Sequence, residues 1–318
     1  MNKLFKESTK IFFKVLMISF FFQPHCRVTS LPSKSVQKGT VSVLDEKFYS
    51  NSKGVIQLQK ITGADWEVDR SGLIDLKDPV SIKKGLTDVK EAIQINFYVL
   101  DHPAYGRFLI DTGIGDVFKK DKSEWPFTWI VKKGMGTDSL KIKTATGEWM
   151  SRNPGKINGV FFTHLHLDHI MGTNDISPDT PLYVGPKEST FKSVMNMMVQ
   201  GNTDEFLKGK TIQELDFSEP NSEQGLSILD FFGDKSFLIF HSPGHTPGSL
   251  AFLIHSKDGL QLLLGDTCHS RFGWENNVPP GDFSDDKEQN KKSLTALQNI
   301  AKKFSVIKIH PGHQNLKE

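Results

Sequence analysis

The six residues from His164 to His169 constrain this chain more than any other stretch, because they hold three histidines and one aspartate. Alternate side chains of an extended segment point to the same side, so the rings of His164 and His166 would face one point. A turn into a helix would bring Asp168 and His169 back toward that point. Neutral imidazole and carboxylate are the ligands of catalytic Zn²⁺ sites. The segment follows a buried-strand pattern, which favours a metal centre over a solvated polar loop.

Length and charge exclude several classes of protein. The chain has 318 residues with 37% hydrophobic and 24% charged residues, as in an ordinary globular protein. The formal net charge is +2, and it becomes −2 without residues 1–30, which hold five basic residues and one acidic residue. We therefore expect no overall attraction to nucleic acid or to anionic lipid. The expected partner is a small-molecule substrate, and the sequence leaves the oligomeric state open.

The N-terminus predicts an export signal over residues 1–30. Three lysines in the first ten residues precede the mostly apolar residues 11–22, and small residues at Val28 and Ser30 suit cleavage after Ser30. The alternative is an uncleaved membrane anchor, although a membrane span needs about 20 apolar residues. We expect an exported protein, periplasmic or secreted, with no membrane contact after cleavage. Cleavage would remove Cys26 and leave Cys268 alone, so no disulfide framework is expected.

Apolar periodicity predicts alternating strands and helices in residues 31–318, which we interpret as a single domain. We expect strands at residues 54–58, 93–100, 107–113, 157–163, 181–184, 236–240, 250–254, 260–264 and 306–309. One helix is expected to begin at Pro186 and to bury Phe191, Val194, Met195 and Met198; another is expected over residues 285–304. Residues 64–90 and 200–225 are expected to be largely irregular. Hairpins among these alternating elements predict mixed sheets.

Residues 114–153 form a possible lid insertion. They carry Trp125, Phe127, Trp129 and Trp149 and are also rich in lysine and glycine. Long connections in compact domains are often functional lids. We weigh a lid or pocket wall, together with Trp274, against an ordinary aromatic core.

Each polar cluster in the second half follows an apolar strand. Four motifs, in this order, resemble those of the metallo-β-lactamase superfamily: His164-x-His166-x-Asp168-His169, Gly244-His245-Thr246-Pro247-Gly248, Gly265-Asp266 and Gly312-His313. Asp111-Thr112-Gly113 resembles an early structural corner of that family. The resemblance covers roughly residues 55–318. It implies an α/β fold of the layered αββα type, in which two mixed sheets lie between helices and metals bind at one edge.

The resemblance also implies a ligand set. His164, His166 and His245 would hold a first metal, Asp168, His169 and His313 a second, and Asp266 would bridge both. Seven ligands with two carboxylates suit two divalent ions about 3.5–4 Å apart that share a water. We expect zinc, although Mn²⁺, Fe and Co²⁺ also occupy such sites. The expected enzyme is a metal-dependent hydrolase that attacks its substrate with a metal-bridging hydroxide, and Asp168, Asp266 and His269 are the candidate catalytic residues.

The local pattern looks most like the acyl-homoserine lactonases and their organophosphate-hydrolysing relatives. Those lactonases carry a tyrosine three positions after the bridging aspartate, whereas this chain has His269, as in the methyl-parathion-hydrolase branch. His269 is expected on the rim of the site, where it would donate a proton to the leaving group or orient another ligand. Cys268 is a weaker candidate ligand. The remaining histidines of the expected domain are interpreted as structural or surface residues: His102, His241, His255 and His310.

The expected reaction is therefore the opening of lactones or related esters by an exported dinuclear hydrolase. The alternatives are a β-lactamase, a phosphotriester hydrolase and a thioester hydrolase on the same site. Asp266 disfavours a β-lactamase, since those enzymes usually place cysteine or serine there. Export away from glutathione disfavours a glutathione thioesterase. A binding module with structural metals is disfavoured too, because structural zinc sites are closed and four-coordinate.

Overall fold

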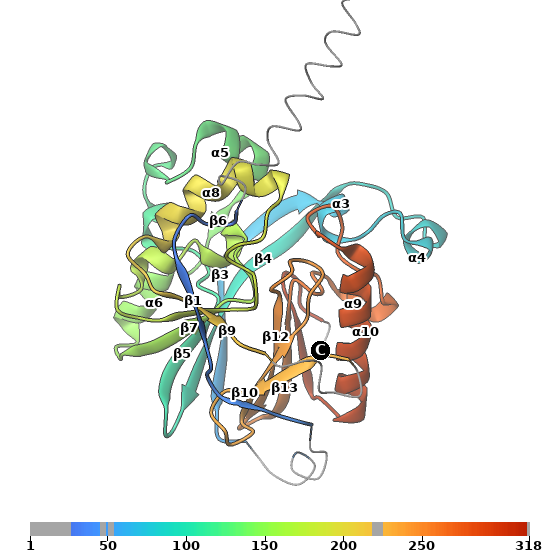
Figure 1. The fold of residues 1–318 in the computed structure, drawn as a ribbon. Coiled ribbons are helices and arrows are strands. Elements are labelled where there is room, and N and C mark those ends of the chain that lie inside the picture. Colours follow the sequence, from blue (N-terminus) through green and yellow to red (C-terminus); the bar gives the residue numbers. More distant parts are fainter. Residues whose placement is uncertain (1–26, 45–48, 50–53, 218–224, 317–318) are drawn as a thin grey trace, which may run out of the picture.

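The computed structural model describes residues 27–44, 49, 54–217 and 225–316. Most of the predicted signal, residues 1–26, lies outside the described residues. No helix within these ranges has the length and the apolar character that crossing a bilayer requires. Figure 1 shows two sheets packed face to face, with helices on the outside.

The first sheet is mixed. Within the described residues it has eight strands in the order β1-β9-β8-β7-β5-β4-β3-β6. Strands β5, β7, β8, β9 and β1 pair in parallel, whereas β4 and β3 pair antiparallel. The strands are β1 (Ser33–Val36), β3 (Gln57–Asp69), β4 (Lys90–His102), β5 (Gly106–Ile110), β6 (Lys141–Ile142), β7 (Ile157–Phe161), β8 (Leu182–Val184) and β9 (Ile212–Leu215).

The second sheet is mixed as well. The described part of the chain gives it six strands in the order β14-β13-β12-β11-β10-β2. Among its described strands, β13 and β14 pair in parallel and the other neighbours pair antiparallel. The strands are β2 (Thr40–Val41), β10 (Ser227–Asp230), β11 (Phe237–His241), β12 (Leu250–Ser256), β13 (Gly259–Gly265) and β14 (Lys308–Pro311).

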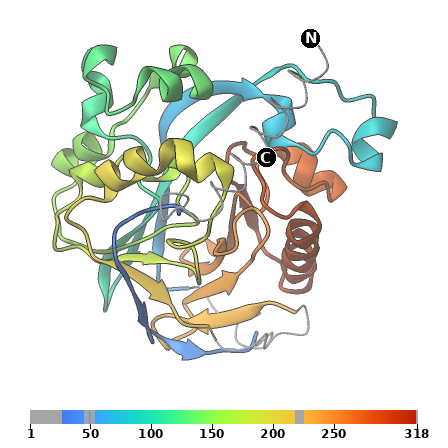
Figure 2. The same ribbon diagram turned by 45° about the horizontal axis from the view of Figure 1, so that its top comes forward.

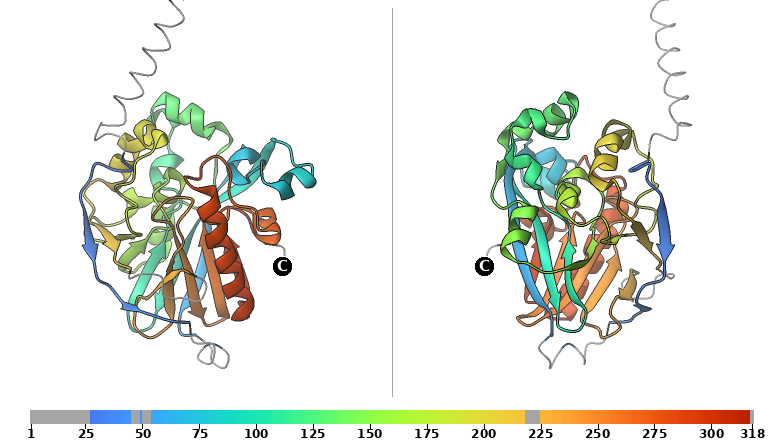
Figure 3. Two further views of the ribbon diagram at one scale, coloured as in Figure 1. Left: turned by 45° about the vertical axis from the view of Figure 1, so that its right-hand side comes forward. Right: turned by 90° about the vertical axis from the view of Figure 1, so that its left-hand side faces the viewer.

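Helices cover the outer faces of both sheets, so the predicted αββα architecture is confirmed (Figures 2 and 3). The α-helices are α3 (Arg70–Leu73), α4 (Pro79–Lys83), α5 (Trp129–Met135), α6 (Thr146–Arg152), α7 (Leu167–Ile170), α8 (Val194–Leu207), α9 (Arg271–Asn276) and α10 (Lys287–Lys303). Short 3₁₀ turns are η2 (Asp116–Lys119), η3 (Lys122–Glu124), η4 (Thr137–Ser139) and η5 (Thr173–Asp175).

The core divides into layers because strand side chains alternate between the two faces of a sheet. On β4, Tyr98 and Leu100 pack between the sheets, whereas Phe97 and Val99 pack under the helices of the first sheet. On the far side, helix α10 buries Leu294, Leu297, Ile300 and Ala301 against the second sheet. This spacing is that of one apolar face of a helix, and α10 confirms the helix expected over residues 285–304.

The sequence interpretation was wrong at three places. Residues 64–69 continue β3 instead of forming a loop, since β4 pairs with the whole length of β3. Residues 200–207 complete α8 and residues 212–215 form β9, so 200–225 is not irregular throughout. The helix expected from Pro186 begins at Val194, after Ser193 caps it by accepting from Asn196 N.

The expected apolar face of that helix is also wrong. Val194 is 71% exposed and Met198 is 59% exposed, so these two residues do not enter the core, whereas Phe191 packs against it. The helix instead buries Phe206 and Leu207 at its C-terminal end, where Phe206 packs against Phe118 and Phe127. Periodicity identified the helix but not which residues pack.

The residues before the predicted cleavage point contact the fold. Val28 and Thr29 are buried. Ser30 N donates to Asp204 Oδ1 at 2.8 Å, and its hydroxyl donates to Asp204 Oδ2 at 2.6 Å. Cleavage after Ser30 would therefore remove an anchoring contact with helix α8.

Candidate metal centre

Four loops bring the predicted ligands to one edge of the sandwich. His164 follows β7, His245 follows β11, Asp266 follows β13 directly, and His313 follows β14. Because these strands end at the same edge, residues separated by up to 149 positions converge there. The two sheets are joined at this point by Leu250 N, which donates to Thr163 O at 2.8 Å.

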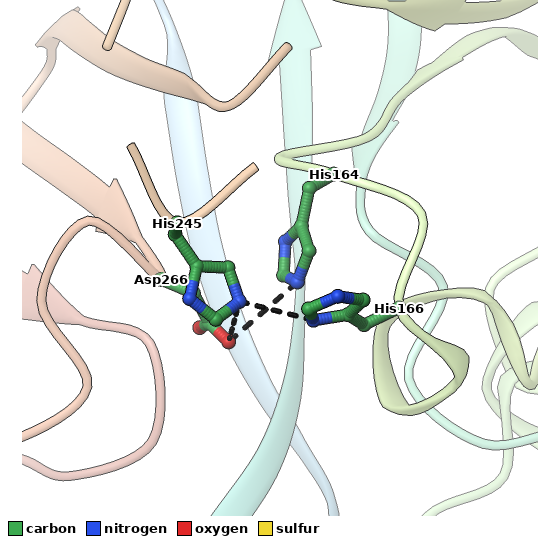
Figure 4. Close-up of side chains that lie close together, drawn as sticks. All are labelled: His164, His166, His245 and Asp266. Atoms are coloured by element: carbon green, nitrogen blue, oxygen red, sulfur yellow. Dashed lines mark hydrogen bonds and ion pairs between the residues drawn. The ribbon is translucent and has the colours of Figure 1, made fainter. Parts of the chain in front are cut away.

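The first group consists of His164, His166, His245 and Asp266, whose ligand atoms all lie within 4.8 Å of one another. Figure 4 shows the three rings and the carboxylate pointing toward a common centre. His245 Nε2 lies 3.0 Å from His166 Nδ1 and 3.5 Å from Asp266 Oδ2. Two nitrogens that share a tetrahedral zinc would be about 3.3 Å apart.

The second group consists of Asp168, His169, Asp266 and His313, and its ligand atoms also lie within 4.8 Å of one another. His169 Nε2 lies 3.3 Å and His313 Nε2 3.2 Å from Asp266 Oδ2. Asp168 Oδ2 is 3.3 Å from His313 Nε2. The same oxygen of Asp266 therefore faces both groups, as expected of a bridging carboxylate.

The outer nitrogens of four rings are held by other groups, which turns Nε2 inward. His169 Nδ1 bonds to Asp111 Oδ2 at 2.8 Å, and His313 Nδ1 donates to Gln94 O at 3.0 Å. His245 Nδ1 pairs with the Ser284 hydroxyl at 3.1 Å, and His164 Nδ1 pairs with the Thr163 hydroxyl at 3.2 Å. Partners of this kind fix the orientation of metal-binding histidines.

Unpaired buried atoms show that these residues fit a metal. Among the described residues, His164 Nε2, His169 Nε2 and Asp266 Oδ1 have no hydrogen-bond partner although they are buried. Leaving such an atom unpaired costs about 1–3 kcal/mol. A divalent cation in each group would supply the missing partner for the nitrogens. The donor set, imidazole and carboxylate, suits zinc.

The histidines of the first group are neutral near pH 7. Burial, with added repulsion from His169 and His166, lowers the pKa of His164 well below its ordinary value. Burial and His166 do the same to the pKa of His245. Burial lowers the pKa of His166 to about 4. Neutral imidazole binds a cation without first losing a proton.

In the second group, the pKa values of His169 and His313 are raised instead of lowered. Burial opposes their charge, but the carboxylates of Asp266 and Asp111 raise the pKa of His169 well above its ordinary value. Asp266 likewise raises the pKa of His313 against the effect of burial. Burial also opposes the charge of Asp266, yet His269 and His313 hold the pKa of its carboxyl well below the usual range.

His269 was expected on the rim of the centre, but it lies inside it. It is only 3% exposed, and its Nε2 lies 2.9 Å from Asp266 Oδ2. Its ring centroid is 5.0 Å from that of His245 and 5.3 Å from that of His313. Neither ring nitrogen has an aligned hydrogen-bond partner among the described residues. His269 thus stands between the two groups and has a nitrogen available for a further contact.

Cys268 and the other histidines do not join the centre. Cys268 is buried, its Sγ donates to Ser270 O at 3.3 Å, and burial raises the pKa of the thiol to about 12. A thiol is a poor metal ligand until it is deprotonated. The histidines interpreted as structural bond elsewhere: His102 to Asp234, His241 to Pro247 O and His310 to Gln261, while His255 packs on Tyr49.

The residues that orient the ligands were not predicted from the sequence. Gln94, Ser284 and Glu188 were not singled out, because each lies far along the chain from the ligand that it supports. A usable signal was present for Glu188, which follows the end of β8, the neighbour of the strand that carries the histidine motif. Gly312 belongs to the motif Gly312-His313, and the structure adds a packing reason for glycine at this position. A Cβ there would lie 2.2 Å from Asp266 Oδ1.

A cavity of about 720 Å³ lies beside His313. It is lined by Asp65, Trp66, Glu67, Glu91, Ala92, Ile93, Gln94, Ser139, Lys141, Arg271, Phe272, Glu275, His313, Gln314 and Asn315. Residues 114–153 contribute Ser139 and Lys141 to this cavity, but the expected aromatic residues of the segment and Trp274 are not part of its lining. Trp125, Phe127 and Trp149 pack in the core, and charged side chains take part in the lining. Whether 114–153 acts as a lid stays a prediction.

Several curated proteins are similar in sequence. N-acyl homoserine lactonase AttM from Agrobacterium fabrum is 26% identical over 236 residues, covering 70% of this chain and 82% of AttM. An N-acyl homoserine lactonase from a Bacillus species is 27% identical over 212 residues, covering 65% of this chain and 76% of that protein. Cytochrome P450 monooxygenase mpaDE from Penicillium roqueforti is 29% identical over 122 residues, but the match spans 14% of its length.

Solved structures show the same fold. AiiA from B. thuringiensis, with N-decanoyl-L-homoserine bound at its active site, superposes with a TM-score of 0.58 at 18% identity, covering 82% of this chain and 94% of AiiA. AidC, a dizinc quorum-quenching lactonase, superposes with a TM-score of 0.53 at 15% identity, covering 84% of this chain and 92% of AidC.

The profile of the metallo-beta-lactamase superfamily matches residues 91–313, which include the histidine motif and the three later motifs. This match covers more than half of the chain and contains both ligand groups. The chain therefore belongs to the metallo-beta-lactamase superfamily.

Proposed function

We propose that this protein opens lactones or related esters at a dinuclear centre, with Zn²⁺ as the metal. The observation that carries the proposal is the shared carboxylate: Asp266 Oδ2 lies within 3.7 Å of His164, His169, His245 and His313 at once. Two cations held around one oxygen form a site for attack on a carbonyl. A purely structural site would need only one closed group of four ligands.

The seven ligand residues would hold the metals, and a different residue would transfer a proton. The first group would hold one cation and the second group the other. When bound, such a pair lowers the pKa of a shared water and polarises the substrate oxygen. The chain itself contributes the spacing of the groups, and its burial of the ligands excludes bulk water from them.

His269 is proposed as the proton donor of the reaction. In lactone opening, a hydroxide oxygen bonds to the carbonyl carbon and the ring carbon–oxygen bond breaks. The leaving alkoxide then needs a proton. His269 is buried between the two groups and has a nitrogen without an aligned partner among the described residues. General acid catalysis of this kind contributes about 10²–10⁴-fold in rate.

The substrate class is supported by the cavity and by the relatives. A cavity of about 720 Å³ lies within the range for small-molecule sites. Its lining combines Trp66 and Phe272 with charged residues such as Arg271, which suits a ligand with both apolar and polar parts. Relatives that are named for lactone hydrolysis match about two thirds of the chain. Relatives named gamma-lactamase, from Fusarium and Gibberella, make cyclic amides the second class to test.

The test is a hydrolysis panel with metal analysis on the same zinc-loaded preparation. The panel contains acyl lactones, γ-lactams, β-lactams, thioesters and phosphotriesters. We expect two zinc ions per chain and the highest kcat/KM on a lactone. Turnover confined to another class would replace the proposed substrate, and fewer than two bound ions would reject the dinuclear centre.

We further propose that the protein is exported. The support is the basic and apolar composition of the N-terminal 22 residues. Cell fractionation tests the location, and mass spectrometry of the mature N-terminus locates any cleavage. A chain that begins after Ser30 would lack the Asp204 contacts described above, whereas one that begins before Val28 would retain them. Activity confined to the cytoplasm would contradict export.

A further inference from the structure

Glu188 lies in the loop after β8 and contacts two of the loops that carry ligands. It is fully buried, with 0% exposure. Its Oε1 accepts from Leu165 N at 2.8 Å, and its Oε2 accepts from the Thr246 hydroxyl at 2.6 Å. The backbone N–H of Gly248 donates to the same carboxylate. One carboxylate therefore links two segments of chain that are about eighty residues apart.

The bonded residues are immediate neighbours of first-group ligands. Leu165 lies between His164 and His166, and Thr246 follows His245. The ligand nitrogens of the two segments lie close together, with His245 Nε2 3.0 Å from His166 Nδ1. A shift of either loop would change that spacing directly. Glu188 does not itself point a ligand atom into either group.

Close packing supports the same role. A Cβ at Gly248 would lie 2.5 Å from the Cβ of Glu188, and a Cβ at Gly185 would lie 2.0 Å from Gly248 O. Both contacts are shorter than real Cβ atoms make. The loop that carries His245 thus rests directly on the turn that carries Glu188, and glycine is required on each side of this contact.

We infer that Glu188 is a positioning residue that sets the distance between the His164–His166 loop and the His245 loop, and so tunes metal affinity of the first group. The inference rests on the proposed dinuclear centre. Burial raises the pKa of Glu188 to about 7, and the hydrogen bonds from Thr246, Leu165 and Gly248 favour its ionised form. The side chain suits this role because three donors converge on its two oxygens, whichever protonation state it holds. A glutamine would present its NH₂ to at least one of these donors.

The test is a Co²⁺ titration followed by visible absorption, which reports ligand geometry as well as affinity. His166→Ala and Asp168→Ala identify which binding step belongs to which group. We expect Glu188→Gln to weaken the first-group step by about 10–100-fold, as is typical for residues that orient ligands. The second-group step should stay unchanged. Thr246→Val, which removes one donor, should weaken the same step by less.

The matched control is Asp230→Asn. Asp230 is also a buried carboxylate, and it accepts from Gly233 N and Lys235 N, at the end of β10 away from the His245 loop. This variant should lose stability without a change in either Co²⁺ step. If Glu188→Gln behaves like Asp230→Asn, Glu188 is only a stability residue and the inference is overturned. Equal weakening of both steps would overturn it too.

The wild-type titration separates this inference from the proposed function. Two Co²⁺ steps in the wild type support the dinuclear centre, whatever the variants do. A wild type that binds fewer than two ions rejects that centre. Glu188→Gln and Thr246→Val both keep the size of the side chain, so neither variant opens a cavity that would itself disturb folding.

Discussion

The two ligand groups share Asp266 but differ in their protonation before metal binds. The first group has histidines whose pKa values are lowered by burial among other rings. The second group has histidines whose pKa values are raised by Asp266 and by nearby carboxylates. Burial alone therefore does not set the protonation state of these rings, since neighbouring charges decide which form is stable.

The difference extends to the residues behind the ligands. In the second group, Asp111 bonds directly to the ring of His169. In the first group, Glu188 bonds to the backbone and hydroxyl of neighbouring residues and leaves the rings alone. Asp111 therefore affects the charge of a ligand, whereas Glu188 affects the position of the ligands. The following experiments test how separate the two groups are.

Asp266→Ala should have the largest effect, because it removes the one side chain that both groups share. We expect activity to fall by more than about 10³-fold, since dinuclear catalysis needs both ions. Metal content should fall to one ion or none, measured by elemental analysis of dialysed protein. Asp266→Asn, which keeps the volume, serves as the control for folding. Retention of two ions in the alanine variant would show that the groups do not depend on the bridge.

His269→Ala should lower kcat by about 10²-fold if His269 is a general acid. Both ions should remain, because His269 belongs to neither group as defined by its geometry. The measurement is kcat as a function of pH for a series of esters that differ in the acidity of the leaving group. The loss of kcat should be smallest for esters with the most acidic leaving groups. His310→Ala removes another buried imidazole outside the centre and should leave kcat unchanged. Unaltered turnover in His269→Ala would make His269 a structural neighbour of Asp266.

Asp111→Asn should weaken the second group more than the first. The substitution removes the charge that pairs with His169 Nδ1, and such changes cost about 10–100-fold in metal affinity. Isothermal titration with Zn²⁺ separates the two steps. Asp234→Asn is the matched control, because Asp234 pairs with His102 at 2.9 Å elsewhere in the fold. A uniform loss over both steps would argue that Asp111 acts through Thr163, which it also contacts.

Acid should release metal from the second group before the first. Since the pKa values of His169 and His313 are raised, protons compete with the metal at higher pH there than on His166, whose pKa is about 4. Affinity should fall about tenfold per pH unit for each displaced proton. Zn²⁺ titrations between pH 8 and pH 5.5 should show a fall from two ions to one. Parallel loss of both ions would remove the distinction between the groups.

The centre could be predicted from sequence because its ligands are concentrated in motifs that follow recognisable strands. His164, His166, Asp168 and His169 lie together in the chain, and apolar runs located the strands before His245, Asp266 and His313. All seven side chains do converge in the structure. The alternation of strands and helices predicted mixed sheets, whereas the layered αββα arrangement was implied by the resemblance of the motifs to those of the superfamily.

Other features depend on contacts that periodicity does not encode. Exposed Val194 and Met198 have the spacing of a buried face, and only the position of α8 on the sheet decides which side is covered. Residues 64–69 look like a polar loop but are held as a strand by their partner β4. The depth of His269 depends on how the loop after β13 folds back. Three-dimensional neighbours of this kind have no local sequence signal.

Gly312 has a consequence for how mutational data on this chain are read. Its Cα stands so near the shared carboxylate that any side chain there would press on Asp266 Oδ1. An alanine scan would thus mark position 312 as essential although glycine performs no chemistry. The loss of activity would come from a steric clash with the Asp266 carboxylate. The backbone after β14 can approach that carboxylate only because residue 312 has no side chain.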